Sequence, residues 1–209
     1  MILTPPVMEE KTMISKTRNL LTAALLALVA VSTPALSQHT GWYVGLGVGQ
    51  STFKGSCDGV VGPGISCAEK DTAFKILEGY QVNQNFGVEF AYIGLGETTA
   101  SFAGFGSAAI AAKGVELLIV GTSPIDQQWS VYGKLGFFRW AVDFKDGTGL
   151  LGSASATGTD LTYGIGVKYN FTKNAASRME YQQYNDVGDF NTTGKGDISV
   201  MGVGVIIGF

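Results

Sequence analysis

Charged side chains recur in this sequence at positions that alternate with bulky apolar residues. Four basic and three acidic residues share the face opposite the apolar one: Lys75, Glu89, Glu116, Lys134, Lys168, Arg178 and Glu180. Such a set could conduct protons or ions, or its members could pair and fill a narrow interior. Whether these charges conduct or pair depends on the fold that holds them, because a small enclosed space favours pairing.

The residue types give little support to nucleophilic, metal or cofactor chemistry. His39 is the only histidine and precedes every predicted strand, so we expect no His–Ser pair for hydrolysis. The chain contains no G-x-S-x-G elbow and no clustered metal-ligand spacing. The segment GLGVGQ lacks the third glycine of a dinucleotide-binding loop. We therefore predict that the protein is not an enzyme and uses no cofactor and no metal.

The amino end has the features of a secretory signal peptide, predicted for residues 1–37, with Met13 as an alternative start. A basic beginning is followed by the apolar run Leu20–Val31 and by a small-x-small cleavage site at Ala35–Ser37. The apolar run is shorter than the roughly 20 residues that a membrane-spanning helix needs. The sequence therefore predicts an exported protein with one domain, residues 38–209.

The two cysteines of the chain lie in one glycine-rich segment, KGSCDGVVGPGISC. Because an exported protein meets oxidising surroundings, Cys57 and Cys67 are expected to form a disulfide. Two free thiols are the alternative. A bond across so short a loop would shape the loop rather than the rest of the fold.

The composition excludes two classes of protein. The formal net charge of −3 argues against nucleic acid as a partner. Thirty glycines, only five prolines and many aromatic residues are not a disordered composition.

Eight segments alternate in character and are separated by turn-forming residues. The predicted strands are Gly41–Phe53, Thr72–Val82, Phe86–Gly96, Lys113–Thr122, Trp129–Phe144, Asp160–Phe171, Ala176–Tyr184 and Asp197–Phe209. Most are longer than the usual strand of a soluble sheet and match a tilted strand that crosses a bilayer.

The kinds of residue on the two faces of each strand indicate which face contacts lipid. In the last strand Val203, Val205 and Ile207 alternate with Gly202 and Gly204. Glycine cannot fill a protein core, so the glycine-rich and charged face suits a narrow interior and the bulky face suits lipid. The predicted fold is all-β, a closed antiparallel eight-stranded transmembrane β-barrel. Its interior charges are expected to pair, with Lys134 as a bridge and Glu116 among its partners.

The connectors alternate between long and short, as in barrels with short periplasmic turns and long extracellular loops. Residues 54–71, 97–112, 145–159 and 185–196 are the predicted loops. Lipid-facing aromatic residues lie next to the short turns and the chain ends, which predicts one interfacial girdle: Trp42, Tyr80, Phe86, Trp129, Tyr169 and Phe171.

These segments resemble, in order and spacing, the transmembrane domain of OmpA-like outer-membrane proteins. The resemblance rests on GWYVGLGVGQS, GYQVNQNFGVEFAYIGLG, GVELLIVGTSPI, VYGKLGFFRW and GVKYNFTKNAASRMEYQQYNDVG. It implies a monomeric barrel in the outer membrane of a Gram-negative bacterium, in contact with lipid and lipopolysaccharide, with paired interior charges. Many members carry a peptidoglycan-binding domain after the barrel, and we expect the barrel alone here.

Some positions stand apart from the pattern of the family or of the barrel. Val120 and Lys168 occupy places where the family leads us to expect an inward Lys and an inward Glu. Glu78 is outward by parity, unless the register slips or it lies at the periplasmic edge. Arg139 is outward near the third loop and could reach lipopolysaccharide phosphates. The last residues resemble the signal read by the barrel-assembly machinery, carried by Gly204, Ile207 and Phe209.

The function predicted from the sequence is that of a small structural and surface barrel whose lumen is plugged by paired charges. The first alternative is an adhesin or serum-resistance factor that binds a host surface through its loops, favoured by the apolar stretch SFAGFGSAAIAA. A narrow ion channel and a lipid-modifying barrel enzyme are further alternatives, and the lack of a histidine within the strands argues against the enzyme.

Overall fold

The computed structural model describes residues 40–209 apart from 61, 105 and 148–151. The predicted signal peptide, Met13 and His39 therefore lie outside the described residues. The described part contains these strands: β1 (Gly41–Phe53), β2 (Ile65–Ala68), β3 (Lys70–Gln81), β4 (Phe86–Phe102), β5 (Gly106–Pro124), β6 (Trp129–Asp146), β7 (Ala154–Asn170), β8 (Ala175–Asp189) and β9 (Gly194–Gly208). None of it forms a helix long and apolar enough to cross a bilayer.

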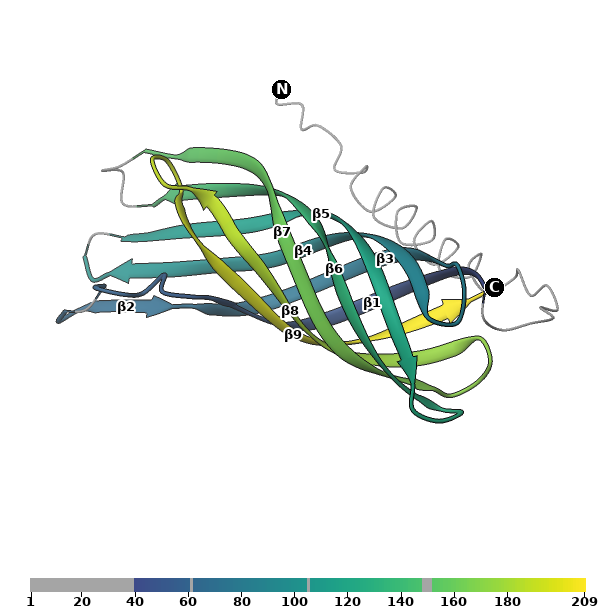
Figure 1. The fold of residues 1–209 in the computed structure, drawn as a ribbon. Coiled ribbons are helices and arrows are strands. Elements are labelled where there is room, and N and C mark those ends of the chain that lie inside the picture. The colour runs from purple at the N-terminus through teal and green to yellow at the C-terminus, as the bar shows by residue number, and fades with distance from the viewer. Residues whose placement is uncertain (1–39, 61, 105, 148–151) are drawn as a thin grey trace, which may run out of the picture. The chain divides into compact units, whose positions relative to one another are not determined.

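The strands close into an antiparallel barrel. β1 pairs with β3 on one side and with β9 on the other, and a β4–β5 pairing completes the ring. The wall contains every strand except β2, which extends only the far end of β4 through pairs such as Ile65–Phe102. Figure 1 shows the long strands tilted across one another around the barrel. The predicted eight-stranded transmembrane barrel is confirmed.

The two ends of the barrel differ. At one end, called the turn end below, residues 82–85, 125–128 and 171–174 connect neighbouring strands. The opposite end, called the loop end, carries β2 and the connections from β1 to β2, β4 to β5, β6 to β7 and β8 to β9. Rings on the outer face contact one another near the turn end: centroids of Trp42 and Tyr80 are 5.2 Å apart, and those of Trp129 and Tyr169 are 4.8 Å apart.

The outer face is apolar and the inner face is mixed, as the alternation predicts. Leu46, Ile119 and Ile165 each expose more than half of their surface. Inward glycines make room for large inward side chains. A Cβ atom on Gly79 would collide with the ring of Tyr43, so this position must be glycine for Tyr43 to lie flat against β3.

The strands extend farther at the loop end than the sequence predicts. Most of the predicted loop 97–112 is a paired hairpin of β4 and β5 that continues to Phe102 and Gly106. A β-bulge between Gly94 and Gly96 lets this ladder continue, and Gly96 has a φ of 76°. Backbone hydrogen bonds between strands do not require alternating apolar side chains. A segment rich in Gly, Ala, Ser and Thr can therefore form strands although its sequence does not predict them.

Apolar residues fill both halves of the barrel interior. The loop-end cluster contains Phe53, Ala73, Ile93, Leu95, Ala112, Phe138, Trp140, Val142, Tyr184, Val187, Ile198 and Val200. The turn-end cluster contains Tyr43, Leu77 and Ala91, with Ile206 packed against them. The inward charged residues share this interior with the two clusters.

Candidate functional site

Six of the seven predicted inward charges form one connected group, called the lumen network below. Its members are Lys75 of β3, Glu89 of β4, Glu116 of β5, Lys134 of β6, and Arg178 and Glu180 of β8. The most exposed side chain is Glu180, at 15%, and the others are buried. The charges of its three basic and three acidic groups cancel.

Lys134 is a bridge, but between different residues from those expected. Its Nζ lies 2.8 Å from Glu89 Oε2 and 2.8 Å from Glu180 Oε2. The expectation that Glu116 is its partner is wrong, because Glu116 pairs with Lys75 instead. Strand adjacency alone does not decide pairing in a small barrel, since side chains from non-neighbouring strands meet across the lumen.

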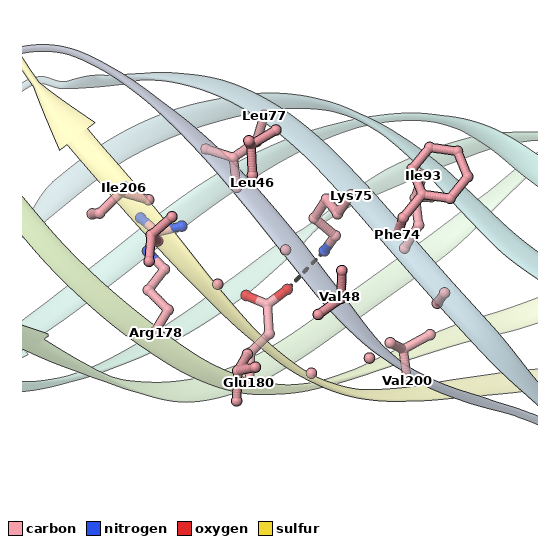
Figure 2. Close-up of a pocket in the computed structure, with 17 residues that line it drawn as sticks. Leu46, Val48, Phe74, Lys75, Leu77, Ile93, Arg178, Glu180, Val200 and Ile206 are labelled. Atoms are coloured by element: carbon pink, nitrogen blue, oxygen red, sulfur yellow. Dashed lines mark hydrogen bonds and ion pairs between the residues drawn. The ribbon is translucent and has the colours of Figure 1, made fainter. Parts of the chain in front are cut away.

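Lys75 occupies the matching position on the other side of Glu180. Its Nζ lies 3.0 Å from Glu116 Oε1 and 2.8 Å from Glu180 Oε1, and it donates a hydrogen bond to Gln182 Oε1 at 2.5 Å. Figure 2 shows Lys75 and Glu180 pointing toward each other. Glu180 therefore bridges the two lysines, one on each of its carboxylate oxygens.

Arg178 and Glu89 form the part of the network nearest the turn end. Arg178 Nη1 lies 2.6 Å from Glu89 Oε1. The guanidinium carbon lies 5.3 Å from the ring centre of Tyr43 and 5.2 Å from that of Tyr132, which stabilises the cation further.

Neutral side chains that the sequence reasoning did not select complete the network. Tyr43 donates a hydrogen bond to Glu89 at 2.8 Å, Tyr132 to Glu180 at 2.9 Å and Tyr184 to Glu116 at 3.0 Å. Gln182 Nε2 donates to Glu116 Oε2 at 2.8 Å and to Thr162 Oγ1 at 2.9 Å. Parity alone would have found Tyr43 and Thr162, because each lies between two apolar residues of the outer face on its strand.

Lys168 stands apart from the network. It is the cross-strand neighbour of Ser130 and Arg178, and its side chain is only partly buried. Within the described residues it makes no ion pair. It lies near the turn-end terminus of β7.

The structure also locates the other positions that the sequence analysis singled out. Glu78 is exposed on the outer face in a regular register opposite Val44 and Phe90, so the register does not slip there. Arg139 is exposed on the outer face, and Val120 is buried in the lumen. At the carboxyl end Gly204 faces inward, whereas Ile207 and Phe209 are half exposed on the outside.

The girdle residues lie at the outer face near the turn end. Trp42, Tyr80, Phe86, Trp129 and Phe171 are exposed. Tyr169 is partly covered by two of its neighbours: its ring centre lies 4.8 Å from that of Trp129 and 5.2 Å from that of Phe171.

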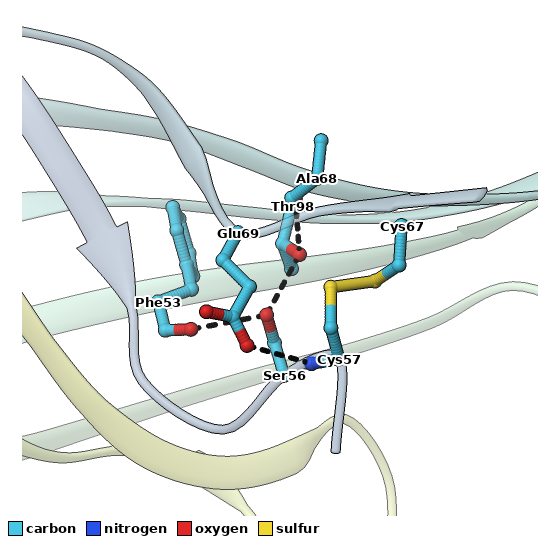
Figure 3. The surroundings of a disulfide bond; sticks show 7 residues. All are labelled: Phe53, Ser56, Cys57, Cys67, Ala68, Glu69 and Thr98. Atoms are coloured by element: carbon cyan, nitrogen blue, oxygen red, sulfur yellow. Dashed lines mark hydrogen bonds between the residues drawn. A yellow bond between two sulfur atoms is a disulfide. The ribbon is translucent and has the colours of Figure 1, made fainter. Parts of the chain in front are cut away.

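Cys57 and Cys67 form a disulfide, with Cα atoms 5.7 Å apart, so the predicted bond is confirmed. It joins β2 to the segment that follows β1. Figure 3 shows the surrounding contacts: the Cys57 amide donates to Glu69 Oε1 at 3.1 Å, and Ser56 Oγ lies 2.9 Å from Thr98 Oγ1. The first loop is thereby tied to β4.

The described residues contain no group of three or more His, Cys, Asp or Glu side chains arranged to hold a metal. The lumen network can neutralise charge and fill space, and its acidic and basic groups are already engaged with one another.

The sequence profile of the OmpA-like transmembrane domain matches residues 37–209. The chain belongs to the OmpA-like transmembrane domain family. Outer membrane protein A of Yersinia pseudotuberculosis is 33% identical over 194 residues, covering 91% of this chain and 54% of the relative. That of Serratia marcescens is 32% identical over 201 residues, covering 91% and 55%. The chain spans about half the length of the curated relatives it matches.

Solved structures show the same fold as this OmpA-like barrel. Neisserial surface protein A has a TM-score of 0.56 at 15% identity, covering 81% of this chain and 97% of that protein. Ail of Yersinia pestis has a TM-score of 0.51 at 17% identity, covering 83% and 100%. The OmpA-like barrel lies in the outer membrane of a Gram-negative bacterium.

Proposed function

We propose that this OmpA-like barrel is a non-catalytic, monomeric structural protein of the outer membrane whose lumen is plugged. The observation that carries the proposal is the balanced lumen network beneath the loop-end cluster. Phe138 and Leu95 are almost completely buried in that cluster, so apolar packing covers the network on the loop side. Ions would have to cross both the lumen network and the loop-end cluster.

Planar-bilayer recordings test the plug. The wild type is expected to conduct poorly, because the lumen charges are paired and no continuous water column passes the loop-end cluster. The double variant Leu95→Ala, Phe138→Ala thins the cluster without touching a charge and should raise conductance. A large, steady and long-lived conductance in the wild type would contradict the proposal.

The outer face supports contact with lipopolysaccharide at the loop half of the barrel. Arg139 is exposed on β6, and Lys113 is exposed on the neighbouring β5, where it lies 3.6 Å from Asp143. Cations at this height suit the phosphates of the outer leaflet. Replacing both by Gln should weaken co-purification of lipopolysaccharide, and unchanged recovery would contradict the contact.

Adhesion to a host surface is a second candidate function. In the stretch SFAGFGSAAIAA, Ala112 is buried and Ile110 packs against the loop-end cluster, and the exposed residues among those described are small: Ala103, Gly104, Gly106 and Ser107. Phe190 instead favours this function, since it follows β8 at the loop end and is 84% exposed. Loss of host-cell binding by bacteria that carry Phe190→Ser would support adhesion, and unchanged binding would count against this residue.

A further inference from the structure

Glu78 of β3 places a carboxylate on the lipid-facing wall. In the half of each described strand that is nearer the turn end, it is the only charged residue that faces outward. It lies opposite Val44 of β1 and Phe90 of β4, and Phe90 exposes 52% of its surface. Within the described residues, Glu78 has no hydrogen bond and no ion pair. An unpaired carboxylate among apolar side chains is costly, so this one should attract a cation from its surroundings.

The position of Glu78 along β3 keeps it within reach of lipid head groups. Tyr80 lies two residues nearer the turn end on the same face, so the two side chains leave the wall roughly 5 Å apart along the barrel axis. Tyr and Trp side chains on the outside of membrane proteins lie at the level of the head groups. The carboxylate of Glu78 therefore starts just inside the apolar band, where the head group of a neighbouring lipid can meet it.

Two exposed rings lie next to this carboxylate. Trp42 pairs with Tyr80 in the β1–β3 ladder, and their ring centres are 5.2 Å apart. Trp42 exposes 52% of its surface and Tyr80 exposes 40%, so both rings are open to the membrane. The faces of such rings attract ammonium groups. Glu78 is next to Tyr80 on the outer face of β3 and is the diagonal neighbour of Trp42, a spacing that lets one small cation contact all three.

We propose that Glu78, Trp42 and Tyr80 bind the primary ammonium head group of a phospholipid, and we call this place the ammonium site. The carboxylate accepts hydrogen bonds from the N–H groups, and the rings contact the cation. The acyl chains lie along exposed apolar side chains such as Ile76 and Phe90. These apolar neighbours favour a lipid over a lysine of a partner protein. A quaternary choline head group suits the site less well, because it has no N–H to donate.

A second aromatic pair on the same wall lacks the carboxylate. Trp129 of β6 pairs with Tyr169 of β7, and their ring centres are 4.8 Å apart. Val167, opposite Val131, takes the place here that Glu78 takes beside the first pair. The barrel therefore contains its own control for the ammonium site.

Proton–nitrogen correlation NMR of the protein in lipid nanodiscs tests the ammonium site. Phosphatidylethanolamine is titrated into phosphatidylcholine, whose head group has the same charges but no N–H donor. The indole signal of Trp42 and the amide signal of Glu78 should shift and then saturate. The indole signal of Trp129 should follow the bulk composition of the bilayer without saturation. Phosphatidylglycerol, which has no ammonium group, should produce no saturable shift at Trp42.

Removal of the carboxylate should weaken the site. Glu78→Gln keeps the size of the side chain and should reduce the apparent affinity for phosphatidylethanolamine at least about tenfold. Trp42→Leu should reduce it about two- to fivefold, as read at the Glu78 amide. Asp143→Asn is the matched control and should leave the titration unchanged, because this carboxylate lies in the loop half of β6 and has Lys113 as its partner.

A transplanted carboxylate tests the inference in the opposite direction. Val167 is 37% exposed on the outer face, so Val167→Glu adds a carboxylate beside Trp129 and Tyr169 without replacing a buried side chain. The Trp129 indole signal should then shift and saturate as that of Trp42 does.

Three results would overturn the inference. One is a Trp42 signal that never saturates and follows that of Trp129, which would mean a change of the whole bilayer. Another is a titration that is unchanged in Glu78→Gln, or a folded Val167→Glu barrel whose Trp129 signal does not saturate. The third is the absence of saturable shifts in nanodiscs together with carbodiimide crosslinking of Glu78 to a lysine of another protein in intact membranes, which would assign the carboxylate to a protein partner.

Discussion

Lys134 and Glu180 meet at 2.8 Å although β7 lies between their strands. The residues of β7 opposite them are Gly164 and Gly166, which place no side chain between the two. A larger residue at either position would fill the space where the lysine and the carboxylate join. The glycines on the inner face are therefore part of the charge arrangement.

Lys134→Met should lower the free energy of unfolding by up to about 3 to 5 kcal/mol, because it leaves buried carboxylates short of one cation. Water in the lumen would reduce this figure. Urea titration of the folded barrel in lipid, followed by tryptophan fluorescence, measures the change. Lys113→Met is the control, since the exposed pair with Asp143 should contribute less than about 1 kcal/mol.

A second substitution, added to Lys134→Met, tests which carboxylate on the other strands contacts Lys134. Adding Glu180→Gln should recover part of the loss, because Lys75 then keeps Glu116 and Arg178 keeps Glu89. Adding Glu116→Gln should recover less, because Glu116 does not touch Lys134 and accepts hydrogen bonds from Gln182 and Tyr184. Greater recovery with Glu116→Gln would refute the observed pairing.

Tyr184→Phe should destabilise the barrel by about 1.5 to 3 kcal/mol, because it removes a buried hydrogen bond to the Glu116 carboxylate. The ring remains and still packs against Phe138, with centroids 4.7 Å apart. Tyr163→Phe is the matched control, since Tyr163 lies exposed on the outer face of β7. Equal urea midpoints for the two variants would argue against a contribution from the Tyr184 hydroxyl.

Cys57 and Cys67 should resist extracellular thiol reagents until a reductant is added. Replacing both by Ser should make residues 54–69 more sensitive to protease, because the loop loses its link to β2. The chain-entropy model allows up to roughly 3 kcal/mol for such a short loop. The urea midpoint of the barrel should change little, and a large fall would show that the bond supports the wall itself.

The turn between β5 and β6 should respond to acid. Asp126 Oδ1 accepts hydrogen bonds from the amides of Trp129 and Gln128, each at 2.7 Å, and these bonds lower the pKa of the Asp126 carboxyl below its usual value. The stabilisation of the turn is therefore present above the ordinary Asp pKa and is lost as the pH falls through the lowered one. Amide NMR shifts of Gln128 and Trp129 should report this titration. They should not do so in Asp126→Ala, and titration at the ordinary Asp pKa in the wild type would contradict the prediction.

The sequence by itself determined the wall of the barrel. Strict alternation of side chains along a strand identifies the lipid-facing and lumen-facing residues without any knowledge of strand pairing, so Leu46, Glu89 and Lys134 could be assigned to their faces. The spacing of two cysteines in one exported loop likewise indicated their bond. The short turns and the girdle aromatics followed from local signals in the same way.

Only the tertiary structure decided what happens inside the barrel and at its loop end. Which carboxylate Lys134 meets depends on the stagger and tilt of strands that are distant in sequence, and alternation carries no information about either. The hydrogen bond from Lys54 to Gln183 likewise depends on how the segment after β1 meets β8 across β9. This contact joins segments more than a hundred residues apart, and the chain must close into a ring before it exists.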